Sequence, residues 1–152
     1  MQDRFLVFVY GTLKKGFPNH DRYMPSAERM GTFRTRDRYR LVLNGERYSP
    51  CLMAGAGQGR YVEGEVFAVD SSGLKQLDRL ERIDRPDGYH RRRIIVDAVD
   101  SPEPEPYEVF VYLKDPERVT DPRSDALGVY TLDAARAYRK RNEGSAHDEG
   151  TF

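Results

Sequence analysis

Apolar runs and stretches that alternate between apolar and polar positions recur along the chain, and most of them predict strands. The first apolar run covers Phe5–Tyr10 and stops at Gly11, which is typical of a strand buried on both faces. Residues 31–43 alternate, which predicts one strand or a hairpin with a wet face. The polar positions of this stretch include a row of arginines, Arg34, Arg36, Arg38 and Arg40. A charged sheet edge that prevents association with other sheets explains this row better than phosphate binding does.

One helix is predicted from about Ser72 to Arg82, where leucines recur at helical spacing. Asp70 or Ser71 is expected to cap its first turn, because a side-chain oxygen can accept a hydrogen bond from the amides that open a helix. Pro86 disfavours the helical conformation of the residue before it, so the helix is expected to end before that point.

Further strands are predicted over residues 60–70, 89–99 and 107–113. Beyond Asp115 the pattern weakens to a second helix over 132–141 and a polar tail from about residue 143, which is expected to be mobile. Many short strands and few helices predict a single α+β domain over residues 1–152, with a sheet that can curl into a small barrel.

Composition narrows the class of protein. Lys plus Arg and Asp plus Glu both total 25, so the net charge is zero and nothing favours nucleic acid or an acidic membrane as a partner. The longest apolar run is too short for a membrane helix and no signal cleavage site follows it, so a cytoplasmic protein is expected. The single Cys51 excludes an internal disulfide, and the three scattered histidines show no zinc spacing.

Glu81 is the candidate residue with the clearest physical signal. It follows Leu77 by four residues and Leu74 by seven, which turns it onto the apolar stripe of the predicted helix. Burial disfavours the charged form, so the pKa of Glu81 is expected to rise above about 4.3, toward the range of a general acid or base. The structural alternative is a buried ion pair with Arg85 or with one of Arg91–Arg93, and the helix alone favours that alternative.

The turn after the first strand is the second candidate. Gly11 lets the backbone approach a ligand closely, and successive amides in such a turn form an anion-binding nest. Neither glycine cluster of the chain fits a nucleotide motif, because Phe17 and Pro18 stand where a phosphate loop needs Lys-Ser/Thr, and Arg60 takes the last glycine position of a dinucleotide fingerprint. Taken alone, both clusters are more often plain turns.

The remaining candidates are weaker. Asp78 lies at the edge of the apolar stripe, and Asp84 falls in the helix end. Cys51 has no nearby histidine to activate it, so a half-buried packing thiol is expected. Tyr89 and Tyr112 are expected at the edge of the core with a partner for each hydroxyl, and they are also candidates for pocket walls.

Three segments together carry a family resemblance. Val7–Gly16 contains a Tyr-Gly-Thr-Leu turn and continues into Phe17–His20, Val62–Asp70 contains Gly-Glu-Val, and Leu77–Glu81 reads Leu-Asp-x-x-Glu. Any one of these pieces is weak, but their combination is specific. It resembles the γ-glutamyl cyclotransferase superfamily (avirulence-induced-gene-like), most closely its γ-glutamylamine cyclotransferase branch, and the resemblance covers roughly residues 5–113.

The resemblance implies a small mixed β-barrel flanked by helices that needs no metal or cofactor. It also implies a monomeric or homodimeric enzyme that converts a γ-glutamyl amine to 5-oxoproline and a free amine. Glu81 corresponds to the family's general acid/base, and the substrate loop corresponds to Tyr10, Gly11, Thr12 and Leu13. Pro50 and Cys51 stand where the family has a pocket-lining segment, and Cys51 departs from its pattern, so the leaving-group preference stays open.

The implied reaction is an intramolecular cyclisation. The α-amino group of the substrate attacks its own γ-carbonyl, while Glu81 takes a proton from that amine and returns it to the departing one. The amides of the Gly11 turn would hold the carboxylate or the developing oxyanion. Two other classes stay open: a non-catalytic binding module for a small carboxylate or γ-glutamyl ligand, and a structural protein with a buried Glu81–arginine pair.

Overall fold

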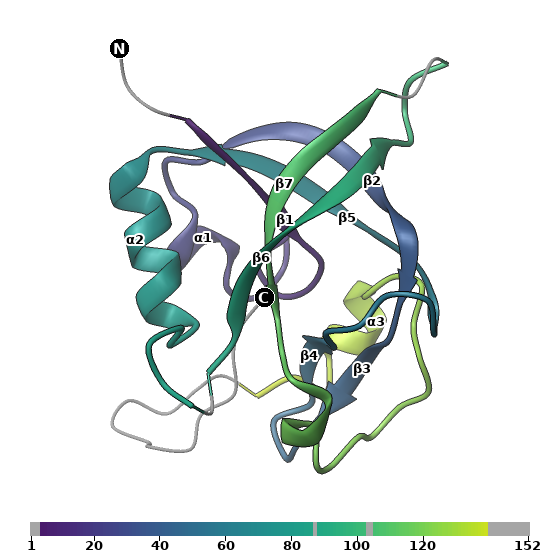
Figure 1. Ribbon diagram of the computed structural model, residues 1–152. Helices are drawn as coiled ribbons and strands as arrows, with labels where there is room; N and C mark the ends of the chain where they lie inside the picture. The colour runs from purple at the N-terminus through teal and green to yellow at the C-terminus, as the bar shows by residue number, and fades with distance from the viewer. Residues whose placement is uncertain (1–3, 87, 103–104, 140–152) are drawn as a thin grey trace.

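Five strands close into a barrel in the order β1-β5-β2-β6-β7, so the predicted mixed barrel is confirmed (Figure 1). The computed structural model describes residues 4–86, 88–102 and 105–139. No helix within these ranges is long and apolar enough to cross a membrane. The elements are β1 Phe5–Val9, α1 His20–Tyr23, β2 Glu28–Tyr39, β3 Leu41–Asn44, β4 Ser49–Leu52, β5 Arg60–Val69, α2 Ser71–Leu80, β6 His90–Ala98, β7 Pro106–Leu113, the 3₁₀ helix η1 Pro116–Arg118, and α3 Leu132–Ala135.

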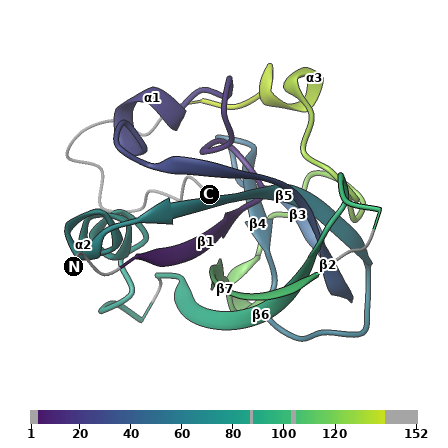
Figure 2. The same ribbon diagram turned by 90° about the horizontal axis from the view of Figure 1, so that it is seen from above.

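β1 is paired along both of its edges, which explains its unbroken apolar sequence. It runs antiparallel to β5 and parallel to β7, where Val7 lies opposite Phe110. Residues 7–9 are completely buried, as expected for a strand covered on both faces. Seen from above, β6 and β7 curve along one side of the barrel, while α1 and α3 lie on the opposite side (Figure 2).

The prediction of a charged sheet edge at the arginine row is wrong. β2 pairs with β5 along most of its length and with β6 over residues 33–35, so it is an internal strand of the closed barrel. The predicted exposure to solvent is confirmed for three arginines of the row, Arg34, Arg36 and Arg38. Arg36 forms an ion pair with Asp97 of β6 at 2.8 Å. The exposed arginines of the row therefore lie on the outer, solvent-facing side of the barrel.

The predicted cap of α2 is confirmed, and its end lies slightly earlier than predicted. The Asp70 carboxylate accepts a hydrogen bond from the Gly73 N–H at 2.7 Å, which satisfies one of the amides that open the helix. The helix ends at Leu80, Glu81 occupies the position after it, and Arg82 follows with a φ of 55°. This left-handed residue terminates the helix without a glycine.

The other strands lie close to their predicted positions, with two differences. The predicted element over 31–43 is divided into β2 and β3, and β3 pairs with β4, a strand that the sequence did not predict. The predicted helix over 132–141 is reduced to the short α3. Residues from 140 onward, including the predicted polar tail, lie outside the described residues.

β5 carries a glycine at the point where it approaches β1. A Cβ at Gly64 would lie 2.4 Å from the Val9 carbonyl oxygen and 2.8 Å from the ring of Phe8. Real Cβ atoms do not approach other atoms so closely, so the two strands can come together only because position 64 has no side chain.

We expect Gly64→Ala to lower the free energy of unfolding by about 1–3 kcal/mol, because the new methyl group must displace backbone. Urea unfolding measures this change. The matched control is Gly128→Ala, whose Cβ would meet nothing closer than 3.5 Å and which is expected to stay within about 0.5 kcal/mol of the wild type. Equal stability of the two variants would contradict this account of barrel closure.

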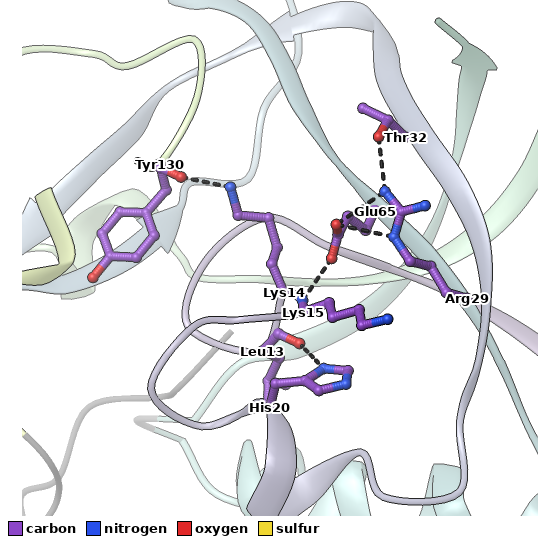
Figure 3. A network of polar contacts seen from close by, with 8 residues as sticks. All are labelled: Leu13, Lys14, Lys15, His20, Arg29, Thr32, Glu65 and Tyr130. Atoms are coloured by element: carbon purple, nitrogen blue, oxygen red, sulfur yellow. Dashed lines mark hydrogen bonds and ion pairs between the residues drawn. The ribbon is translucent and has the colours of Figure 1, made fainter. Parts of the chain in front are cut away.

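The chain beyond β7 returns to the loop that follows β1, and a buried lysine joins the two. The Lys14 side chain extends to the carbonyl oxygen of Tyr130, to which Nζ donates a hydrogen bond at 2.5 Å (Figure 3). The Lys14 Nζ also lies 4.3 Å from the centre of the Phe17 ring. Burial lowers the pKa of Lys14 from its ordinary value of 10.5 to about 8, against a smaller opposing effect of Glu65 and Glu63.

This pKa predicts a pH-dependent contribution to stability. Between about pH 8 and pH 10.5, the unfolded chain holds a proton on Lys14 that the folded protein has released, so the free energy of unfolding rises with pH in this window. The free energy of unfolding of the wild type minus that of Lys14→Met is expected to rise by roughly 2 kcal/mol from pH 8 to pH 10. Below pH 7 this difference is expected not to change with pH. Tyrosine ionisation is common to both proteins and cancels. A difference independent of pH would contradict the shifted pKa.

Candidate active site

The turn after β1 is held in place by residues that follow it closely in the sequence. The Lys14 N–H donates to the Gly11 carbonyl at 3.1 Å, which closes the turn. Asn19 holds Thr12 twice: its backbone N–H donates to the Thr12 carbonyl at 3.0 Å, and its Nδ2 donates to Thr12 Oγ1 at 3.0 Å. Asn19 is itself buried. No role for Asn19 was predicted from the sequence, although a polar residue directly after a proline is a common turn signal.

Two further contacts fix the turn to the barrel and to α1. The Lys15 N–H donates to Glu65 of β5 at 2.7 Å, and the Glu65 carboxylate is paired with Arg29 of β2 at 3.1 Å. The Leu13 carbonyl oxygen lies 2.8 Å from Nδ1 of His20, the first residue of α1 (Figure 3). The backbone of the turn is therefore supported on both sides.

Two inner amides of the turn have no acceptor among the described residues. Among the described residues, no hydrogen bond uses the backbone N–H of Gly11 or of Leu13 as its donor. Both residues are buried, and buried amides normally have an acceptor. Adjacent N–H groups of this kind are suited to bind a carboxylate or an oxyanion.

Glu81 is buried together with three tyrosines. Its side chain is 1% exposed, and Tyr10, Tyr89 and Tyr112 are equally inaccessible. Burial raises the pKa of all three hydroxyls, and the negative charge of Glu81 contributes to the rise in each case. A Coulomb interaction weakens with distance, so the effect of the Glu81 charge on all three phenols is the reason to group these four buried residues, which we call the cluster.

The hydrogen bonds of this cluster join elements that lie far apart in the sequence. The Tyr10 hydroxyl donates to the Tyr112 carbonyl of β7 at 2.9 Å. The Tyr89 N–H donates to the Glu81 carbonyl at 2.9 Å, and the Tyr89 hydroxyl lies 3.1 Å from the Cys51 Sγ of β4. The cluster thus assembles the ends of β1, α2 and β7 with the start of β6.

Three expectations about these side chains need correction. Cys51 is completely buried and not half-buried, because the unpredicted β4 places it inside the fold. Tyr89 and Tyr112 do have hydroxyl partners, but they lie in the core and not at its edge. Pro50 is buried beside Cys51 and pairs with Leu43 of β3.

Asp78 is connected to the cluster, although the sequence ranked it low. Its carboxylate accepts a hydrogen bond from the Tyr112 hydroxyl at 2.6 Å and another from the Arg91 guanidinium. After burial, this hydrogen bond is the largest cause of the raised pKa of Tyr112. Asp84, the other weak candidate, is exposed. Asp78 therefore fixes the ring of Tyr112 next to Glu81.

The arginines that the sequence offered as partners of Glu81 lie elsewhere. Arg91 is bound to Asp78, Arg93 lies 3.9 Å from Glu108, and Arg85 and Arg92 are exposed. Within the described ranges, no group of three or more His, Cys, Asp or Glu side chains is arranged to hold a metal ion. The chemical groups gathered here are a buried carboxyl, neutral phenols and backbone amides, a set suited to proton transfer and anion binding.

Comparisons with known proteins identify the family of the chain. The chain matches the family described as gamma-glutamyl cyclotransferase, AIG2-like, over residues 7–132. It is 40% identical over 129 residues to gamma-glutamylaminecyclotransferase B of Danio rerio, covering 80% of this chain and 66% of that protein. It is 42% identical over 119 residues to gamma-glutamylaminecyclotransferase of Homo sapiens, covering 70% of this chain and 76% of that protein.

Solved structures show the same fold. The crystal structure of an AIG2-like protein from Mus musculus superposes with a TM-score of 0.76 and 29% identity, covering 93% of this chain and 98% of that one. The family match includes the turn after β1, the Gly-Glu-Val segment and Glu81, which are the three pieces that carried the resemblance in the sequence. The chain belongs to the gamma-glutamyl cyclotransferase, AIG2-like family.

Proposed function

We propose that this protein is a γ-glutamylamine cyclotransferase, which releases 5-oxoproline and a free amine from a γ-glutamyl amine. The observation that carries the proposal is the burial of Glu81 beside Tyr10, the residue that leads into the Gly11 turn. The names of the zebrafish and human relatives support the choice of γ-glutamyl amines as the substrate class.

Glu81 is the proposed general acid and base. The α-ammonium group of a substrate has an ordinary pKa of about 7.7–8.0 and must lose a proton before its nitrogen can attack. A carboxylate that is removed from water is a stronger base than one in solution, because burial disfavours its charged form. After the proton moves to Glu81, a bond forms between the α-nitrogen and the γ-carbon. Glu81 donates this proton to the leaving nitrogen as the bond from the γ-carbon to that nitrogen breaks and the carbonyl re-forms. The bonded α-nitrogen also loses a second proton, so the ring keeps one N–H and the released amine, which takes up this second proton, departs as an ammonium ion.

The turn after β1 is the proposed binding site for the negatively charged end of the substrate. The Gly11 and Leu13 amides can donate to the α-carboxylate or to the oxyanion that develops on the γ-carbonyl. Holding both ends of a flexible glutamyl chain favours the ring-closing geometry, and such orientation can contribute several kcal/mol to the rate. A single oxyanion donor is typically worth about 3 kcal/mol.

The tyrosines are proposed to form neutral walls around the reacting atoms. Because the pKa of each of the three hydroxyls is raised, none of them adds a second negative charge near Glu81 at neutral pH. Tyr10 and Tyr112 have their protons directed to the Tyr112 carbonyl and to Asp78, which fixes the two rings. The walls are closed to solvent, so a side chain or the turn must move to admit a substrate.

The alternative classes are less well supported. A structural role for Glu81 was expected to use Arg85 or one of Arg91–Arg93, and these side chains lie elsewhere. A binding module needs the turn but gives no reason to exclude a carboxyl group from water beside it, since burial of such a group is costly.

We expect Glu81→Gln to lower kcat/KM by at least about 100-fold, because glutamine has the shape of glutamate but cannot accept the proton. The assay is release of 5-oxoproline from a panel of γ-glutamyl amines, which also identifies the preferred leaving amine. Circular dichroism checks that the variant is folded.

The matched control for this variant is Glu108→Gln, which removes an exposed carboxylate on β7 and is expected to keep wild-type activity. If Glu81→Gln released 5-oxoproline at the wild-type rate, the assignment of Glu81 would be lost. If the wild type acted on no γ-glutamyl amine, the proposed activity itself would be lost.

A further inference from the structure

The chain beyond β7 returns to the barrel and, at residue 138, contacts the loop that carries the turn of the candidate active site. We call residues 127–139 the return segment. Its start is held by β3 and by the barrel strand β5, because the Leu127 N–H donates to the Leu41 carbonyl at 2.8 Å and the Gly128 carbonyl accepts from the Glu63 N–H at 2.8 Å. The family match ends at residue 132, so the last part of this segment lies outside it.

The return segment contacts the loop after β1 at two points. The first is the hydrogen bond from Lys14 Nζ to the Tyr130 carbonyl (Figure 3). The second is a hydrogen bond of 3.0 Å from Asn19 Nδ2 to the hydroxyl of Tyr138. The first contact uses only the backbone of the segment, whereas the second depends on one particular side chain.

Asn19 connects Tyr138 to the turn. A carboxamide nitrogen carries two protons, and Asn19 Nδ2 donates one to Thr12 Oγ1 and the other to the Tyr138 hydroxyl, each at 3.0 Å. Asn19 is only 4% exposed, so water has little access to replace either bond. The same carboxamide nitrogen thus joins the Thr12 hydroxyl to the Tyr138 hydroxyl.

Tyr138 is itself held from the turn between β3 and β4. An Arg47 guanidinium nitrogen donates to the Tyr138 hydroxyl at 3.1 Å, and the centre of the guanidinium lies 5.7 Å from the ring. Arg47 also forms two hydrogen bonds with the backbone of Arg139, of 3.0 Å and 2.9 Å. The hydroxyl thus stands between a fixed guanidinium and the carboxamide of Asn19.

We infer that Tyr138 is a positioning residue for the substrate turn, acting through Asn19 on Thr12 and hence on the neighbouring Gly11 and Leu13 amides. Tyr138 does not touch the reacting atoms. The inference rests on the proposed function, since it names the residue that keeps the proposed anion site in shape. Without the hydroxyl, one buried proton of Asn19 has no acceptor, the carboxamide can turn, and the amides of the turn lose their alignment.

The direct test is Tyr138→Phe, which keeps the ring over Arg47 and removes only the hydroxyl. We expect kcat/KM to fall 5- to 30-fold, mainly because KM rises. A fall of this size corresponds to a loss of about 1–2 kcal/mol. Hydrogen exchange of the Gly11–Lys14 amides is expected to become faster, while the melting temperature changes little.

The matched control is Tyr130→Phe in the same segment. The Tyr130 hydroxyl is buried and makes no hydrogen bond with the described residues, and the variant keeps the carbonyl that Lys14 contacts. Both KM and the exchange rates of the turn are expected to stay at wild-type values. A similar effect of both variants would mean that the segment acts by general packing, and it would overturn the inference.

A double-mutant cycle tests the route through Asn19. If Tyr138 acts on the turn only through Asn19, then Asn19→Ala and the double variant Asn19→Ala/Tyr138→Phe are equally impaired in KM and in amide exchange. Additive effects, or a Tyr138→Phe variant with wild-type KM and exchange, would overturn the inference. Exchange rates and the affinity for 5-oxoproline need no turnover. A wild type without cyclotransferase activity but with Tyr138-dependent exchange would therefore refute the proposed function alone.

Discussion

The exclusion of the Glu81 carboxyl from water is the constraint on which the site depends. A buried carboxyl requires polar neighbours that compensate for lost hydration without adding negative charge. The three buried tyrosines meet the second requirement, because burial raises the pKa values of their hydroxyls and keeps them neutral. The protons of the Tyr10 and Tyr112 hydroxyls are directed to other acceptors, the Tyr112 carbonyl and Asp78. At neutral pH these phenols therefore add no negative charge to the surroundings of Glu81.

Closure of the barrel brings this carboxyl to the turn. β1 enters the centre of the fold because both of its edges are paired and because Gly64 lets β5 approach it closely. β7 then carries Tyr112 beside β1, where the Tyr10 hydroxyl reaches its carbonyl. α2 follows β5 directly (Figure 1), and Glu81 is the residue that follows its last turn. The proposed acid/base and the proposed anion site thus meet through pairing between distant strands.

The features that local physics controls could be predicted from the sequence. The apolar run of β1, the Asp70 cap and the inward direction of Glu81 all follow from spacing over a few residues. The internal position of β2 could not be predicted, because it depends on pairing with β6 across the chain. The same holds for the contact between Asn19 and Tyr138, which are 119 residues apart. Burial of Cys51 was missed because β4 has too short an apolar pattern to indicate a strand.

Binding of 5-oxo-L-proline, followed by amide chemical shifts of the labelled protein, tests the central claim most directly, because this ligand has both the carboxylate and the ring expected of the product. The account predicts that the largest shifts fall on the amides of residues 11–13 and on Tyr89, whose N–H is bonded to the Glu81 carbonyl. It also predicts that Glu81→Gln retains this binding while losing catalysis. Saturable binding with shifts confined to another part of the barrel, leaving both the turn and the end of α2 unchanged, would contradict the account.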